Sequence, residues 1–260
     1  MEFSITTDAY DDGEPIGPRF CDFSEGGFRS IHWCDHWVSP KRYSKDETAE
    51  VLRLAENAGI VVQDVHSVCG VGDGADFPDD LWLALNINRL QFISTLGGDC
   101  IVLHLPKGKK TGTMVEDILA SKRLLDMLRP HADRYGVRAA IENLGDSDYA
   151  LFDELLESYP AGYLGFCFDS GHANIAGQSE MVDRYADRLI ALHLHDNDGT
   201  ADQHNLPGNG TIDWPPIVHT IKSCGYRKAV NLEVHKPSDA EPGQWCKIAY
   251  ETVKSLWHAT

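Results

Sequence analysis

The chain has 260 residues and a formal net charge of -17, from 40 acidic and 23 basic residues. This length suits one α/β barrel domain over residues 1–260, and no linker, low-complexity run or short repeat divides it. The acidic excess argues against a protein that grips nucleic acid, because each phosphate contact needs a cation. Seven scattered cysteines without a C-x-x-C pair are typical of reduced, mostly buried thiols. With no leader-like start and no apolar run near ~20 residues, we expect a cytoplasmic protein without a membrane span.

Strand-like and helix-like segments alternate along the chain. Apolar runs predict strands at residues 3–7, 30–37, 60–68, 100–106, 139–144, 165–173, 189–195 and 229–235. Helical spacing and stop signals predict helices at about 44–58, 81–96, 113–135, 149–158, 178–188, 214–224 and 242–257. Residues 8–28 are expected to form a loop, and two capping boxes, Ser44 with Glu47 and Thr113 with Glu116, begin helices. Eight alternating units of this kind predict an α/β fold of the (β/α)₈ TIM barrel type with one domain.

Polar side chains collect where the predicted strands end. In the stretch 189–213, His193 and His195 are two apart on a strand, so both rings point to the same side, and Asp202 and His204 follow in a loop. Because the carboxyl ends of barrel strands open onto one face, we expect the active site there.

Nine of these residues are candidate ligands for Zn²⁺ or Mn²⁺. They are His66, His104, Glu142, Asp169, His172, His195, Asp202, His204 and Glu233. A carboxylate inside an apolar strand costs several kcal/mol unless it is paired or metal-bound, which favours a functional role for Glu142 and Glu233. A lone histidine such as His66 or His104 is more often a hydrogen-bonded structural residue, and only the collection as a whole favours a metal site.

Other conspicuous residues leave alternatives open. The basic run from Lys107 to Lys110 is either a solvated loop or a contact for a substrate phosphate. His32, Asp35 and His36 are ambiguous. The pair Trp33 and Trp37 is more typical of barrel packing than of a sugar platform.

Five motifs carry a resemblance to a known family. They are IENL (141–144), FDSGHA (168–173), HLHDNDG (193–199), DQHNLPGNG (202–210) and LEVH (232–235). Together they resemble the xylose isomerase-like barrel superfamily, which joins sugar and sugar-phosphate isomerases and epimerases with the endonuclease IV group. The resemblance implies one divalent ion held by Glu142, Asp169, His195 and Glu233. Its endonuclease IV branch adds ligands at His66, His104, His172, Asp202 and His204, which would allow one to three ions in all.

The resemblance implies a metal-dependent isomerase or epimerase that acts on a small sugar, sugar phosphate or keto-sugar through a metal-stabilised enediolate. Glu142 and Glu233 would be the acid and base, and the candidate substrate-binding residues are His172, His104, His193, Asn143, His32 and His36. One alternative is an endonuclease IV-like, zinc-dependent phosphoesterase for abasic DNA or a small phosphate. In place of that enzyme's aromatic-bearing segment, however, this chain reads SVCG after His66. Further alternatives are a metal-dependent keto-sugar or inosose dehydratase and a non-catalytic binding barrel.

The resemblance leaves two matters open. Substrate choice is expected to lie in the loops at residues 8–28, 69–80 and 106–112. Assembly into a homo-oligomer is also an open alternative.

Overall fold

The computed structural model describes residues 1–10, 14–69, 77–105, 113–145 and 148–259. Eight strands form one parallel sheet in the order β7-β6-β5-β4-β3-β2-β1-β8. Their bounds are β1 (Phe3–Thr6), β2 (Ser30–Trp33), β3 (Val61–His66), β4 (Cys100–Leu103), β5 (Arg138–Glu142), β6 (Leu164–Asp169), β7 (Leu189–His193) and β8 (Val230–Leu232). The two outer members of this order meet just beyond their ends, where Leu194 pairs in parallel with Leu232. The sheet is therefore a nearly closed barrel, as the alternating sequence pattern predicts.

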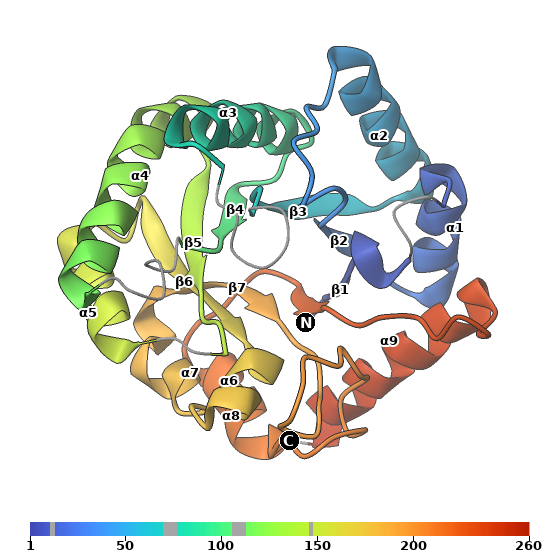
Figure 1. Ribbon diagram of the computed structural model, residues 1–260. Coiled ribbons are helices and arrows are strands. Elements are labelled where there is room, and N and C mark those ends of the chain that lie inside the picture. Colours follow the sequence, from blue (N-terminus) through green and yellow to red (C-terminus); the bar gives the residue numbers. More distant parts are fainter. Residues whose placement is uncertain (11–13, 70–76, 106–112, 146–147, 260) are drawn as a thin grey trace.

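Helices follow the strands and cover the outside of the barrel (Figure 1). They are α1 (Ile16–Gly26), α2 (Lys45–Ala58), α3 (Asp79–Thr95), α4 (Met114–Tyr135), α5 (Tyr149–Ser158), α6 (Ser170–Ala176), α7 (Met181–Arg184), α8 (Trp214–Ser223) and α9 (Pro242–Ala259). Two short 3₁₀ helices occupy Thr7–Ala9 and Ala186–Arg188. The predicted capping boxes at Ser44 and Thr113 are both present, and each begins its helix.

Alternation along the strands divides the buried residues into two layers. Ile101, Ile141 and Phe168 belong to the large core shared with the helices. Between them in sequence, small side chains such as Ala140 and Cys167 form a separate cluster inside the barrel. Because successive side chains point to opposite faces of a strand, residues two positions beyond this inner cluster continue into the carboxyl-terminal mouth. This alternation of side-chain directions brings the candidate site residues to the carboxyl-terminal mouth of the barrel.

Four predicted segments differ from the structure. The expected loop at residues 8–28 contains α1, because Phe20 and Phe23 bury a helical face that the local Gly and Pro residues mask in the sequence. The strand predicted at 30–37 ends at Trp33, so residues 34–37 lie outside it.

The other two differences lie in the second half of the chain. The strand predicted at 165–173 ends at Asp169, whose side chain accepts a hydrogen bond from the backbone N–H of His172 and so begins α6. The helix predicted at 178–188 breaks at Tyr185, where the backbone leaves helical geometry. The basic run Lys107–Lys110 and most of the loops at 69–80 and 106–112 lie outside the described residues.

Two expectations from composition can be compared with the structure. All seven cysteines are free, and four of them, Cys34, Cys100, Cys167 and Cys246, are buried. Within the described part of the chain, no helix combines the length and apolar character that a membrane crossing requires.

Candidate metal centre

Four side chains converge at the mouth of the barrel. Glu142, Asp169 and His193 are the last residues of β5, β6 and β7, and Glu233 directly follows β8. Each offers one ligand atom, and these four atoms all lie within 4.8 Å of one another. All four residues are at most 5% exposed. All four side chains point into the barrel mouth, because each lies two positions after a residue that faces the inside of the barrel.

His193 lies at the middle of this group. Its Nδ1 is 3.2 Å from Glu142 Oε1 and 3.1 Å from Glu233 Oε2. Neither ring nitrogen of His193 has a hydrogen-bond partner among the described residues, although the ring is buried. Three buried carboxylates thus surround a ring that makes no well-aligned hydrogen bond to them. Such a set of donor atoms suits a divalent cation. Glu142, Asp169, His193 and Glu233 therefore fit a bound ion.

His195 lies at the edge of this group, and its ligand atom is within 4.8 Å of those of His204 and Glu233. His195 Nε2 lies 3.2 Å from Asp169 Oδ1 and 3.5 Å from Asp202 Oδ1. Its ring stacks on His204 with centroids 4.1 Å apart. The ligand role of His195 stays a prediction. The pairing of neighbouring strands could have indicated His193, because Asp169 of β6 lies directly opposite His193 of β7.

The buried charges of the centre shift one another's pKa values. Burial by itself raises the pKa of Glu142 and of Glu233. His193 together with His104 and His172 for Glu142, and His193 together with His204 for Glu233, outweigh burial and hold both pKa values well below their usual range. Burial lowers the pKa of His193, whereas Cys167, Glu233 and Glu142 raise it well above its usual range. The imidazolium thus supplies the positive charge that a divalent ion would supply when bound.

A second group of residues lies on the β3 and β4 side of Glu142. The Nε2 atoms of His66 and His104 are 3.6 Å and 3.1 Å from Glu142 Oε2. Cys69 joins the two histidines, with ligand atoms within 4.8 Å of one another. The ring of Trp37 packs on them, with its centroid 5.3 Å from that of His66. A packing role was predicted for Trp37, and Cys69 was not predicted to belong to the site.

A third group lies beside Asp169. Asp202 Oδ2 is 3.3 Å from His172 Nε2 and 3.2 Å from His204 Nε2. The Nδ1 atoms of these histidines lie 3.0 Å from the carbonyl oxygen of Asn143 and 2.8 Å from that of Glu233. Because a carbonyl oxygen only accepts hydrogen bonds, each Nδ1 carries a proton, and each Nε2 faces the carboxylate of Asp202, to which it donates when the ring is protonated. His204 also adopts a left-handed backbone with φ 49°, which is uncommon outside glycine.

The remaining predicted substrate-binding residues have different surroundings. Asn143 exchanges two hydrogen bonds of 2.8 Å with the backbone of Asp169. His32 is completely buried, and its Nδ1 lies 2.8 Å from Asp64 Oδ1. His36 lies in a turn with φ 60°, where its carbonyl oxygen accepts a hydrogen bond from Arg89. The roles predicted for these three residues in substrate binding stay predictions.

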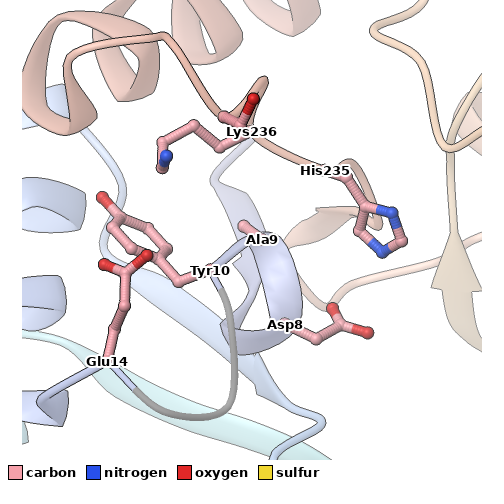
Figure 2. Close-up of a pocket in the computed structure, with 7 residues that line it drawn as sticks. Asp8, Ala9, Tyr10, Glu14, His235 and Lys236 are labelled. Carbon is pink, nitrogen blue, oxygen red and sulfur yellow. The ribbon is translucent and has the colours of Figure 1, made fainter.

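A small cavity of about 190 Å³ adjoins the site at the ends of β1 and β8 (Figure 2). Asp8, Glu14, His235 and Lys236 are among its lining residues. His235 stacks on His204 with centroids 4.2 Å apart, which joins this cavity to the third group. Two carboxylates and one ammonium therefore line it. Asp8 and Glu14 belong to the segment 8–28 in which substrate choice was expected, but none of the four residues was predicted individually as a site residue.

Asp196 fixes the loop that carries Asp202 and His204. The buried carboxylate of Asp196 accepts hydrogen bonds from the backbone N–H groups of Asn197 and Gly208, at 2.9 and 2.8 Å, and from Trp214 Nε1 at 3.0 Å. It lies in the HLHDNDG motif, but its role is to organise the loop. The third group is therefore held by α8 as well as by the strands.

The chain is similar to known proteins over most of its length. Over 241 residues the chain is 28% identical to the uncharacterized protein y4fM of Sinorhizobium fredii. The aligned part is 80% of this chain and 78% of that relative. Over 247 residues it is 23% identical to an inosose dehydratase of Lacticaseibacillus casei, which covers 82% of this chain and 71% of the relative.

Solved structures share the fold. A D-tagatose 3-epimerase-like protein superposes with a TM-score of 0.79 at 18% identity and covers 100% of this chain and 99% of its own. The IOLI protein, solved with a zinc atom, superposes with a TM-score of 0.78 at 17% identity over 100% of this chain and 99% of its own. The family model described as xylose isomerase-like TIM barrel matches residues 23–256. The chain belongs to the xylose isomerase-like TIM barrel family.

Proposed function

We propose that the protein is a metal-dependent isomerase or epimerase that acts on a small keto-sugar. The observation that carries this proposal is the convergence of Glu142, Asp169, His193 and Glu233 within 4.8 Å at the barrel mouth. Glu142, Asp169, His193 and Glu233 would hold the ion, with His193 in place of the predicted His195. A bound divalent ion would supply a Lewis acid that polarises a substrate carbonyl.

Glu142 and Glu233 are the proposed acid and base. Their oxygens approach the same His193 nitrogen from β5 and β8, so the two carboxylates lie on two sides of the centre. One carboxylate takes the proton from the carbon beside the carbonyl, and the electron pair moves to the carbonyl oxygen. The other, protonated as a carboxylic acid, gives its proton to the opposite face of that carbon, which gives epimerisation. For isomerisation, the proton goes to the former carbonyl carbon, while the proton of the adjacent hydroxyl group moves to the former carbonyl oxygen, so that the carbonyl and the hydroxyl group exchange places. No oxidant or reductant is needed.

Nearby histidines would orient the substrate hydroxyls. His104 Nε2 lies 3.1 Å from Glu142 Oε2, and His172 Nδ1 lies 3.5 Å from Glu142 Oε1. Burial lowers the pKa of His104, but Cys69 and Glu142 outweigh burial and raise that pKa to about 9. A protonated His104 donates hydrogen bonds only, which suits a hydroxyl or carbonyl oxygen.

The cavity at β1 and β8 favours an uncharged substrate over a phosphorylated one. Asp8 and Glu14 would repel a phosphate there, and Lys236 is the single cation among the described lining residues. Hydroxyl groups, by contrast, can donate to both carboxylates. We expect neutral ketoses or inososes to react in preference to their phosphates.

The test is deuterium uptake from D₂O into unphosphorylated ketohexoses and inososes with metal-loaded protein, followed by mass spectrometry. Glu233→Gln should lower exchange about 10²- to 10⁴-fold, the usual contribution of a general acid or base. Glu241→Gln, an exposed position at the start of α9, is the matched control and should exchange like the wild type. Unchanged exchange in Glu233→Gln would exclude the assignment.

A dehydratase is a second candidate, favoured by the likeness to inosose dehydratase. It begins with the same proton removal, but the electron pair then expels a hydroxyl group from the adjacent carbon as water, with a proton supplied by the second carboxylate. The same deuterium experiment separates the two, because a dehydratase gives a product 18 mass units lighter than its substrate, roughly the mass of one water.

A phosphoesterase is a third candidate, favoured by the two additional histidine groups around Glu142 and Asp202. Several ions held together are the arrangement that activates water for attack on phosphorus. Zinc-saturated protein that nicks abasic DNA or hydrolyses a small phosphodiester, while leaving keto-sugars unchanged, would replace the isomerase proposal.

A further inference from the structure

A buried Asp–His pair lies directly below the candidate metal centre and has no role in the proposed reaction. Asp64 in β3 and His32 in β2 are register partners in the sheet. Asp64 is 2% exposed and His32 is not exposed at all. Asp64 precedes His66 by two positions, so it lies on the same inner register one layer deeper in the barrel.

The contact between them sets the tautomer of His32. His32 Nδ1 lies 2.8 Å from Asp64 Oδ1. Because an ionised carboxylate only accepts hydrogen bonds, Nδ1 carries the proton, and in the neutral ring Nε2 keeps a lone pair. This Nε2 is buried and has no hydrogen-bond partner among the described residues. Leaving such a buried acceptor unpaired is unfavourable.

His193 presents the matching unpaired group. Its Nδ1 faces Glu142 and Glu233, which leaves Nε2 on the other side of the ring without a partner. The rings of His32 and His193 have centroids 4.5 Å apart and planes inclined by 60°. Ligand atoms of His32, His193 and Glu233 lie within 4.8 Å of one another. The two rings therefore lie side by side, and each has a buried Nε2 without a hydrogen-bond partner among the described residues.

We propose that Asp64 and His32 are positioning residues for His193. His32 Nε2 accepts the hydrogen bond of His193 Nε2–H, directly or through one water, and so fixes Nδ1 as the atom that faces the ion. Outer hydrogen bonds of this kind orient metal-binding histidines and raise their affinity for the ion. The inference rests on the proposed ion but not on the reaction.

Cys167 is the competing neighbour of His193. Ligand atoms of Cys167, His193 and Glu142 also lie within 4.8 Å of one another. A thiol is only a weak donor and acceptor, whereas an imidazole held by a carboxylate is a strong acceptor. Cys167→Ala therefore serves as the matched control, since it removes the other group beside the same ring.

The first test measures zinc affinity of the metal-free protein by competition with a chromophoric chelator. Asp64→Asn, which is nearly isosteric, and His32→Gln should each weaken zinc binding about 10- to 100-fold, and Cys167→Ala should bind as the wild type does. Wild-type affinity in both pair variants, or an equal loss in Cys167→Ala, would overturn the proposal.

The second test needs no variant and does not depend on folding of a substituted barrel. Long-range ¹H–¹⁵N correlation spectra of the zinc-loaded wild type report the protonated nitrogen of each histidine. The proposal requires His32 protonated at Nδ1 and His193 protonated at Nε2 with zinc at Nδ1. Zinc at Nε2 of His193, or His32 protonated at Nε2 alone, would contradict it. Neither test uses a sugar, so a failure of the isomerase proposal leaves this result standing, and the reverse also holds.

Discussion

Gly171 determines where His195 can lie. A methyl group at Gly171 would come within 1.9 Å of His195 Cε1 and 2.5 Å of both ring nitrogens. Because His195 is fully buried, it has no room to move aside. Gly171→Ala should therefore lower the free energy of unfolding by about 1–3 kcal/mol, the usual cost of overpacking a core. Urea denaturation measures this change.

Gly162→Ala is the control for this substitution. A methyl group at Gly162 meets nothing within 4 Å, and the backbone there needs no positive φ. Its free energy of unfolding should match that of the wild type or exceed it slightly. If Gly171→Ala is equally harmless, the close packing of His195 on α6 is refuted.

Single residues also show what the sequence could not decide. It predicts that His193 and His195 share one side of a strand, and both indeed flank Asp169. Which of them joins Glu142 and Glu233 depends on the relative shift of neighbouring strands, which spacing within one strand does not reveal. Cys69, Trp37 and the residues of the β1 and β8 cavity reach the site through loops, and loops carry no periodic signal.

Among the elements, α2 illustrates a start signal that is readable from sequence and open to testing. Ser44 Oγ accepts a hydrogen bond from the backbone of Glu47 at 3.2 Å, and the Glu47 carboxylate accepts one from the backbone of Ser44 at 2.8 Å. Ser44→Ala should cost about 0.5–2 kcal/mol of unfolding free energy, because it removes this cap. Ser39→Ala, just outside the helix, is the comparison and should cost less.

The same cap predicts a pH dependence. Hydrogen bonding to Lys41 and to Ser44 lowers the pKa of Glu47 from 4.5 to about 2. Since the folded pKa lies below the unfolded one, the stabilisation by Glu47 is complete above a pH of about 4.5 and is lost as the pH falls toward 2. The stability gap between wild type and Glu47→Gln should therefore narrow between neutral pH and about pH 3 in urea titrations. A gap that widens on acidification would contradict this assignment.

Other elements show where local patterns fail. Apolar strands followed by capped helices are predicted well, because periodicity and caps are local signals. Helix α1 escapes detection since its first turns contain Gly17 and Pro18, although Phe20 and Phe23 bury its inner face. The early end of β6 depends on Asp169, which both caps α6 and joins the site, so its functional position cuts the strand short.

On the scale of the whole molecule, the fold gathers three carboxylates in one buried group, and a bound cation should stabilise it. We expect the melting temperature of metal-free protein to rise on addition of Zn²⁺, with about 2.7 kcal/mol of stabilisation when free zinc is 100 times its Kd. Scanning calorimetry with and without a chelator measures this. A melting temperature that does not respond to zinc or manganese would contradict ion binding to the folded barrel.

The most direct measurement is a calorimetric titration of metal-free wild type and of Glu233→Gln with Zn²⁺ and with Mn²⁺. The four-residue centre predicts a tight first ion per chain in the wild type and its loss or strong weakening in Glu233→Gln. Additional weaker ions would engage the histidine groups at His66 and His172. A first ion that binds Glu233→Gln as tightly as the wild type would show that the centre formed by Glu142, Asp169, His193 and Glu233 is not the metal site.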